Sequence, residues 1–304
     1  ARGLGDVYKR QAVICLAVFF TNFPFGQWLS GWDNLHPEFN PWLNISRSFT
    51  AVWQENQGVG HLGGHGHAAN LLHSLFLGAL SLFLPASSLR ALFTFLMLFA
   101  GGFGTFFLAN HFLKSKQVQS KTLYAASFLA SVLYLLNFST VQNFYVQLES
   151  FIIFYGLLPW TLLTLFQYLD LPKRKTLLRF GLMSVLLSAI GFIPPLFVAY
   201  GIVVGFILLF YWLGKRKQES LKRMFVIGGV LLLTNAYWLL PTAYFTATTS
   251  SVYLYSQNNQ LSTQDFNLQS ISFGGFTDVA LMRGFMIASI DSPTEPGQRS
   301  FYIM

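Results

Sequence analysis

The sequence has few charged residues and almost no cysteine. Asp, Glu, Lys and Arg make up only 10% of its 304 residues, whereas 53% of the residues are hydrophobic and 33 are Phe. This composition and a mean hydropathy of +0.49 lie far from the average of soluble domains, so a soluble fold is excluded. Because Cys15 is the single cysteine, an intrachain disulfide is excluded as well.

Two kinds of ligand site are also missing from the sequence pattern. No Gly-rich phosphate-binding loop follows a predicted strand, so no nucleotide site is expected. The 19 Lys and Arg outnumber the 11 Asp and Glu, but they do not alternate with aromatic residues on a polar module. Nucleic acid is therefore not an expected partner.

Long apolar runs predict an all-α polytopic membrane protein, because a helix needs about 20 apolar residues to cross the hydrocarbon core. We expect seven runs to be spans: Ala12–Phe25, Ala91–Leu113, Thr122–Leu136, Phe151–Tyr168, Leu177–Phe192, Pro195–Leu213 and Met224–Leu240. A further run, Ala69–Leu84, has about 16 residues, which is below the usual spanning length.

Basic residues between these runs predict the topology. Twelve of the nineteen Lys and Arg form three clusters, which are Lys114–Lys121, Lys173–Arg179 and Lys215–Arg223. The positive-inside rule places all three in the cytoplasm, near anionic lipid. Residues 26–90 then lie outside only if Ala69–Leu84 does not cross, so we expect this run to lie in the outer interface. An eighth, short span is the alternative.

The two ends of the chain predict its domain organisation. Residues Asp6–Gln11 (DVYKRQ) are similar to the translation of a transposase sequencing adapter, so residues 1–11 are expected to be non-native. A transmembrane module is expected over residues 12–243, with its first outer loop at 26–90. Residues 244–304 are polar and are expected to begin an extracytoplasmic region of a longer protein.

The polar stretch Gly26–His67 gathers titratable side chains directly after the first apolar run. Asp33 follows that run closely, so its carboxylate is placed near the outer membrane surface, where it could act as a general base. A turn or helix N-cap is the alternative role. A helix is expected over Trp42–Glu55, on which Arg47 either pairs with a lipid phosphate or is solvated.

The histidines of this stretch leave several roles open. His61, His65 and His67 lie in a Gly-rich segment whose spacing does not favour a metal site. The segment could instead contact a phosphate or a sugar, or be a plain polar loop. Glu149, at the start of a later apolar run, could bind sugar hydroxyls, orient a cation or simply begin a helix.

The sequence resembles the GT-C superfamily of glycosyltransferases that use polyprenyl-phosphate sugars. The resemblance lies in the acidic residue soon after the first span, in Asn40-Pro41, Arg47 and Trp53–Gly58 of the large loop, and in Asn235–Pro241 at the last span. These segments are most similar to bacterial arabinofuranosyltransferases of the AftD type.

The resemblance implies an enzyme with Asp33 as its catalytic base, on the extracytoplasmic face of a prokaryotic plasma membrane. The implied partners are a polyprenyl-phosphate-linked sugar, a glycan or lipid acceptor, and membrane lipids. No cofactor is expected, although a divalent cation is conceivable. The remaining candidate substrate contacts are Asn34, His36, Glu38, Arg47, Glu55, His61, His65, His67, Arg90 and Glu149.

Two other functions stay open at this stage. A lipid or polysaccharide transporter would need polar groups inside its spans, and these spans contain few. A non-catalytic membrane assembly protein would fit the hydrophobicity but would leave the polar loop without a role.

Overall fold

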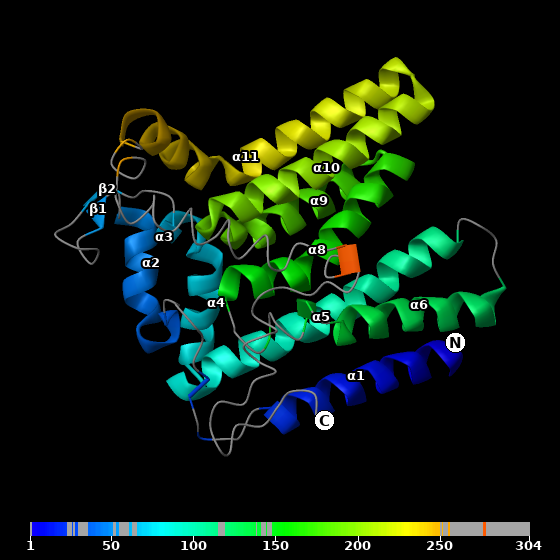
Figure 1. Ribbon diagram of the computed structural model, residues 1–304, viewed down its shortest axis with the longest axis horizontal. Coiled ribbons are helices and arrows are strands. Elements are labelled where there is room, and N and C mark those ends of the chain that lie inside the picture. The colour runs from blue at the N-terminus through cyan, green and yellow to red at the C-terminus, as the bar shows by residue number, and fades with distance from the viewer. Residues whose placement is uncertain are drawn as a thin grey trace.

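The computed structural model describes residues 2–22, 26, 28–29, 36–50, 53–54, 61–62, 66–114, 119–137, 139–140, 144, 148–249, 251, 255 and 276–277. Its principal helices, in chain order, are α1 (Arg2–Asn22), α2 (Pro41–Thr50), α3 (Gly66–Ala69), α4 (Leu71–Ser81), α5 (Ala86–Lys114), α6 (Ser120–Leu136), α8 (Glu149–Asp170), α9 (Arg174–Leu186), α10 (Pro194–Lys215) and α11 (Gln218–Thr249). Short 3-10 helices, η1 (Pro37–Phe39) and η2 (Leu187–Phe192), precede α2 and α10. Figure 1 shows the long helices side by side, with α2, α3 and α4 gathered at one end.

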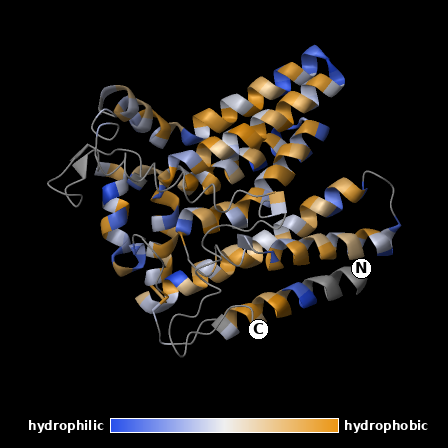
Figure 2. Ribbon diagram, viewed as in Figure 1, coloured by the Kyte–Doolittle hydropathy of each residue, from blue (hydrophilic) through white to orange (hydrophobic). Residues whose placement is uncertain are grey.

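The prediction of a helical protein with membrane-length apolar helices is confirmed. Within the described residues, five segments are long and apolar enough to cross a membrane: α5, α8, α9 together with η2, α10 and α11. Figure 2 shows apolar residues along these helices and hydrophilic residues at the turn between α10 and α11. The helix α6 is apolar but has 17 residues, and α1 does not count among the five segments.

Side-chain contacts fix the relative direction of the helices. α5 and α8 run parallel, since Arg90 contacts Glu149 at their starts and His111 contacts Asp170 at their ends. At the end of α8, Arg223 from the start of α11 donates a hydrogen bond to the carbonyl of Leu169.

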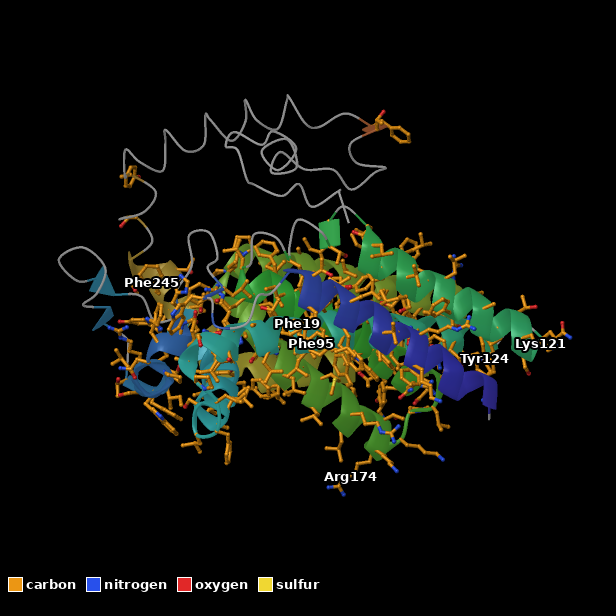
Figure 3. The ribbon with its side chains drawn as sticks, turned by 90° about the horizontal axis from the view of Figure 1, so that it is seen from below. Phe19, Phe95, Lys121, Tyr124, Arg174 and Phe245 are labelled. Atoms are coloured by element: carbon orange, nitrogen blue, oxygen red, sulfur yellow. The ribbon has the colours of Figure 1, made fainter. Side chains whose placement is uncertain are left out.

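Contacts with α8 also fix the direction of α6 and the position of η2. α6 runs antiparallel to α8, because Tyr134 near its end donates to the carbonyl of Tyr155 near the start of α8. η2 also lies at the start of α8, where Ser150 donates to the carbonyl of Ala189. The described residues of all three basic clusters therefore lie at one end of the bundle, opposite α2, α3 and α4 (Figure 1). Figure 3 likewise places Lys121 at the end opposite Phe245, near the end of α11.

Glycines allow α5 to pack closely against α8. A Cβ added at Gly104 would lie 2.7 Å from the indole nitrogen of Trp160, and one added at Gly156 would lie 2.9 Å from the carbonyl oxygen of Met97. The Trp160 indole donates a hydrogen bond to the carbonyl of Ala100 at 2.9 Å. The α5–α8 contact thus combines close backbone approach with a polar tie, the usual way in which membrane helices associate.

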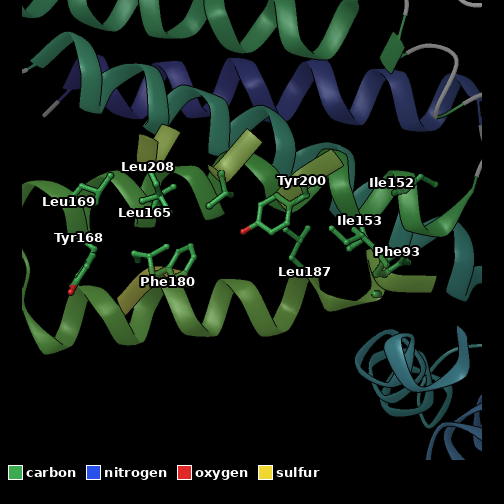
Figure 4. Close-up of a cluster of buried hydrophobic side chains, with 14 of the residues drawn as sticks. Phe93, Ile152, Ile153, Leu165, Tyr168, Leu169, Phe180, Leu187, Tyr200 and Leu208 are labelled. Carbon is green, nitrogen blue, oxygen red and sulfur yellow. The ribbon is translucent and has the colours of Figure 1, made fainter. Parts of the chain in front are cut away.

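Two apolar clusters form the core. The larger joins α8, α9 and α10, with Leu165, Phe180 and Leu208 among its buried side chains (Figure 4). The smaller cluster lies around Cys15, whose side chain is 1% exposed, and packs α1 against α5, α6 and α8. The first helix is therefore attached to the bundle through apolar contacts.

The helices α2, α3 and α4 differ in two ways from the sequence prediction. The helix expected over Trp42–Glu55 ends at Thr50, and Trp53–Gln54 pairs instead with His61–Leu62 as a two-residue antiparallel ladder. The run Ala69–Leu84 is not one helix, because α3 and α4 are separated by Asn70. With 11 residues, α4 is only about 17 Å long, far below the thickness of about 30 Å of a bilayer core.

Candidate functional site

A cluster of charged side chains is buried where the first loop meets the starts of α5 and α8. Arg90 is its centre: the guanidinium contacts Glu149 through one nitrogen, and the other terminal nitrogen lies 3.5 Å from Glu38 Oε1. The Arg90 and Glu38 side chains are 4% and 2% exposed, and that of Glu149 is 14% exposed. We call Arg90, Glu38, Glu149 and His36 the charged cluster.

Local structure explains how each member reaches this place. Glu38 lies in η1, which begins with Pro37, and Arg90 lies in the second turn of α5. Glu149 is the first residue of α8, where a carboxylate interacts favourably with the helix dipole. Three separate segments of the chain therefore converge on one buried guanidinium.

His36 completes the charged cluster and is its most accessible member. Its Nδ1 lies 2.9 Å from Glu38 Oε1 and 2.7 Å from an Arg90 nitrogen, and its side chain is 27% exposed. Arginine is always protonated, so Arg90 donates to His36 Nδ1 when that nitrogen carries no proton. When Nδ1 carries a proton, His36 donates to Glu38 Oε1 instead. His36 thus forms the link between the buried charges and the exterior.

A second histidine lies beside the charged cluster. His73 on α4 packs against Phe93, with 4.4 Å between the ring centroids, and its Nδ1 lies 3.2 Å from Asn70 Oδ1. Burial, with a smaller contribution from the Arg90 charge, lowers the pKa of His73 to about 3. His73 is therefore neutral at physiological pH and serves packing, as a buried aromatic ring does.

The other candidate site residues do not join the charged cluster, or lie where the structure gives no placement. Arg47 is half-buried on α2, and no acidic residue of the described ranges lies within ion-pair distance of it. The His67 side chain is 5% exposed on α3, and its carbonyl accepts a hydrogen bond from Ser48. Asp33, Asn34, Glu55, His65 and the His61 side chain lie outside the described residues.

Arg90 and Glu149 were each candidates for substrate contact, but the sequence analysis did not pair them. They are 59 positions apart, and the pairing depends on how α5 and α8 align. The available signal was that each is a lone charge at the start of an apolar helix, and that both helices were expected to start on the same side. Ionisable groups in such positions commonly pair with each other.

The described residues include no group of three or more His, Cys, Asp or Glu side chains arranged to hold a metal ion. With one guanidinium between two carboxylates, the charged cluster is instead suited to hydrogen bonding and proton exchange. Comparisons with protein-family models, with curated protein sequences and with solved structures find no match to the chain.

Proposed function

We propose that the chain is a membrane glycosyltransferase module that moves a sugar from a polyprenyl-phosphate donor to an extracytoplasmic glycan or lipid acceptor. In this proposal seven helices cross the plasma membrane of a prokaryote, and α2, α3 and α4 lie at the outer surface. One observation carries the proposal: the charged cluster fixes the first loop onto the starts of α5 and α8.

In this proposal the charged cluster also holds the segment that carries the base near the bundle. Asp33 precedes His36 by three residues, and three residues of chain reach at most about 11 Å. Because the side chains of His36 and Glu38 are held by Arg90, the segment that carries Asp33 is attached close to a rigid part of the bundle. A catalytic carboxylate depends on such positioning more than on its basicity.

The donor phosphate needs a cation, and the contacts of the charged cluster help to decide between the candidate arginines. Residues 26–90 contain two fixed cations, Arg47 and Arg90. Arg90, one of the candidate substrate contacts, is buried between two carboxylates that would repel a phosphate. Arg47 on α2 is the better candidate to bind the phosphate and to stabilise its departure.

The proposed reaction uses these groups in one displacement. Asp33 accepts the proton of the acceptor hydroxyl as that oxygen bonds to the anomeric carbon of the sugar. The bond between this carbon and the phosphate oxygen breaks, and the lipid phosphate leaves with the bonding electrons, opposite Arg47. The stereochemistry at the anomeric carbon is thereby inverted.

A transporter is less well supported, because several polar groups inside the bundle bind one another or helix carbonyls. Ser131 donates to the carbonyl of Gly102 at 2.7 Å, and Asn235 donates to Ser184 at 3.1 Å. These groups join neighbouring helices and do not line a path.

The test is a transfer assay with the full chain in lipid nanodiscs, using radiolabelled polyprenyl-phosphate pentose and hexose donors and a membrane glycan extract as acceptor. We expect Asp33→Asn to lower transfer by about 100-fold or more, the range of general-base catalysis. Asp170→Asn, which changes a carboxylate at the opposite end, is the matched control and should retain activity. Equal activity of Asp33→Asn and wild type would refute the proposal.

A further inference from the structure

Exposed aromatic rings lie in a row beside the charged cluster. The rings of Trp28 and Phe39 are 4.8 Å apart between centroids, and those of Phe39 and His36 are 5.3 Å apart. Trp28 is 51% exposed and Phe39 is 62% exposed, so their outer faces are open. We call Trp28, Phe39 and His36 the aromatic row.

The charged cluster contains buried polar atoms that have no hydrogen-bond partner among the described residues. Glu38 Oε2 and Arg90 Nε are both buried, and neither has a hydrogen-bond partner within the described part of the chain. The Thr94 hydroxyl, one helical turn beyond Arg90 on α5, is also buried without a hydrogen-bond partner in this part of the chain. Buried polar atoms are almost always paired, so an acceptor and a donor without partners point to a polar ligand or to water.

The charge of the cluster selects the kind of ligand. Two carboxyl groups, Glu38 and Glu149, lie beside the single guanidinium of Arg90, and they disfavour an anion such as phosphate. A neutral ligand with several hydroxyl groups fits, because a hydroxyl can bond to His36, the accessible member of the cluster, as donor or as acceptor.

We infer that the aromatic row and the charged cluster together form a binding site for a neutral sugar ring. The C–H face of the ring would lie on Trp28 and Phe39, and its hydroxyls would bond to His36, the accessible member of the charged cluster. Assigning this sugar to the acceptor glycan rests on the proposed function, whereas sugar binding itself does not. The site is separate from the phosphate contact proposed at Arg47, so donor phosphate and acceptor sugar are bound by different parts of the first loop.

The test measures sugar binding by saturation-transfer NMR, with the full chain in nanodiscs. The probes are the methyl glycosides of galactopyranose, mannopyranose and arabinofuranose, with inorganic phosphate as an anionic competitor. We expect saturation of ring protons for at least one glycoside, no displacement by phosphate, and at least a fivefold loss of signal in Trp28→Ala and in Phe39→Ala. Trp42→Ala is the matched control, because Trp42 is 56% exposed on α2 and is not part of the aromatic row.

Three outcomes would overturn the inference: no signal above that of empty nanodiscs, displacement by phosphate, or equal losses in Trp28→Ala and Trp42→Ala. A membrane contact is the other role for exposed aromatic residues at this level. It is tested by 19F NMR of 5-fluorotryptophan at position 28, assigned by comparison with Trp28→Ala. We expect a water-soluble gadolinium chelate to broaden this resonance, whereas broadening by spin-labelled lipid alone would assign Trp28 to the membrane and overturn the inference.

This test separates the two proposals. If glycosides bind through Trp28 but no donor supports transfer, the sugar site stands and the enzyme proposal fails. If transfer depends on Asp33 but Trp28→Ala leaves glycoside binding unchanged, the enzyme proposal stands and the sugar site fails.

Discussion

The same two helices, α5 and α8, are joined by a charged contact at each end, and the two contacts differ in burial. At their starts Arg90 contacts Glu149, with side chains 4% and 14% exposed. At their ends His111 contacts Asp170 at 3.0 Å, with side chains 26% and 68% exposed. Water screens the second contact and not the first, so similar pairings have very different energies.

The comparison shows at which end of the bundle the charged contacts select a single arrangement of the chain. Basic residues at the ends of α5 and α8 remain solvated, and a mispairing there costs little. At the starts of these helices, a single guanidinium must meet two carboxylates in one geometry, because an unpaired buried charge is strongly unfavourable. The buried contact thus selects one arrangement of the first loop on the bundle.

The largest expected effect concerns the side of the membrane on which each end lies. In a Cys15→Ala background, Ser46→Cys on α2 should react with a membrane-impermeant maleimide added to intact cells, and Ser120→Cys at the start of α6 should not. Permeabilised cells, in which both should react, provide the control. Labelling of Ser120→Cys alone would reverse the proposed topology.

The next effect concerns the buried guanidinium. Arg90→Gln leaves Glu38 and Glu149 without their cation, so we expect a loss of about 3–5 kcal/mol in the free energy of unfolding. Arg179→Gln removes an exposed charge at the other end and should change it by less than about 0.5 kcal/mol. Denaturation in mixed detergent micelles measures both variants. Equal values would remove the distinction between the two ends.

Double-mutant cycles sharpen the comparison within one pair of helices. We expect a coupling energy of about 2–3 kcal/mol for Arg90→Gln with Glu149→Gln, because the groups contact each other away from water. For His111→Asn with Asp170→Asn we expect about 0.2–1 kcal/mol, the range of exposed ion pairs. A larger coupling at the exposed pair would contradict this order.

The last expected effect is a pH dependence from His73, beside the charged cluster. Its folded-state pKa of about 3 lies below the ordinary value of 6.5, so between these pH values the unfolded chain binds a proton that the folded chain does not. Stability should therefore fall with falling pH in this window, by up to about 1.4 kcal/mol per pH unit. His73→Phe should show a correspondingly weaker dependence below pH 6.5, and an unchanged slope would rule out this residue as its cause.

Hydrophobic runs were enough to predict the long helices. The run Phe151–Tyr168 corresponds to α8 and Thr122–Leu136 to α6, each within two residues, because apolar length is a local property. The helices α2, α3 and α4 were predicted less well. The ladder of Trp53–Gln54 with His61–Leu62, which follows the end of α2, depends on a partner strand and not on the preceding helix.

The candidate site shows the same limit. The sequence identified His36, Glu38, Arg90 and Glu149 as polar groups expected on one side, but it could not bring them together. That step requires the register of α5 against α8, which is set by close contacts such as Gly104 with Trp160. Pairing across 59 positions is a tertiary property, and local propensity carries no information about it.

The buried thiol of Cys15 gives the protein an intrinsic reporter of local opening. Cys15 is the single cysteine and lies where α1 packs on Leu98 and Leu135. A thiol reagent can reach it only when α1 separates from α5 and α6, so the rate of modification follows the exchange of this helix between bound and detached states. The stability of α1 on the bundle can therefore be resolved from that of the whole fold without introducing a label.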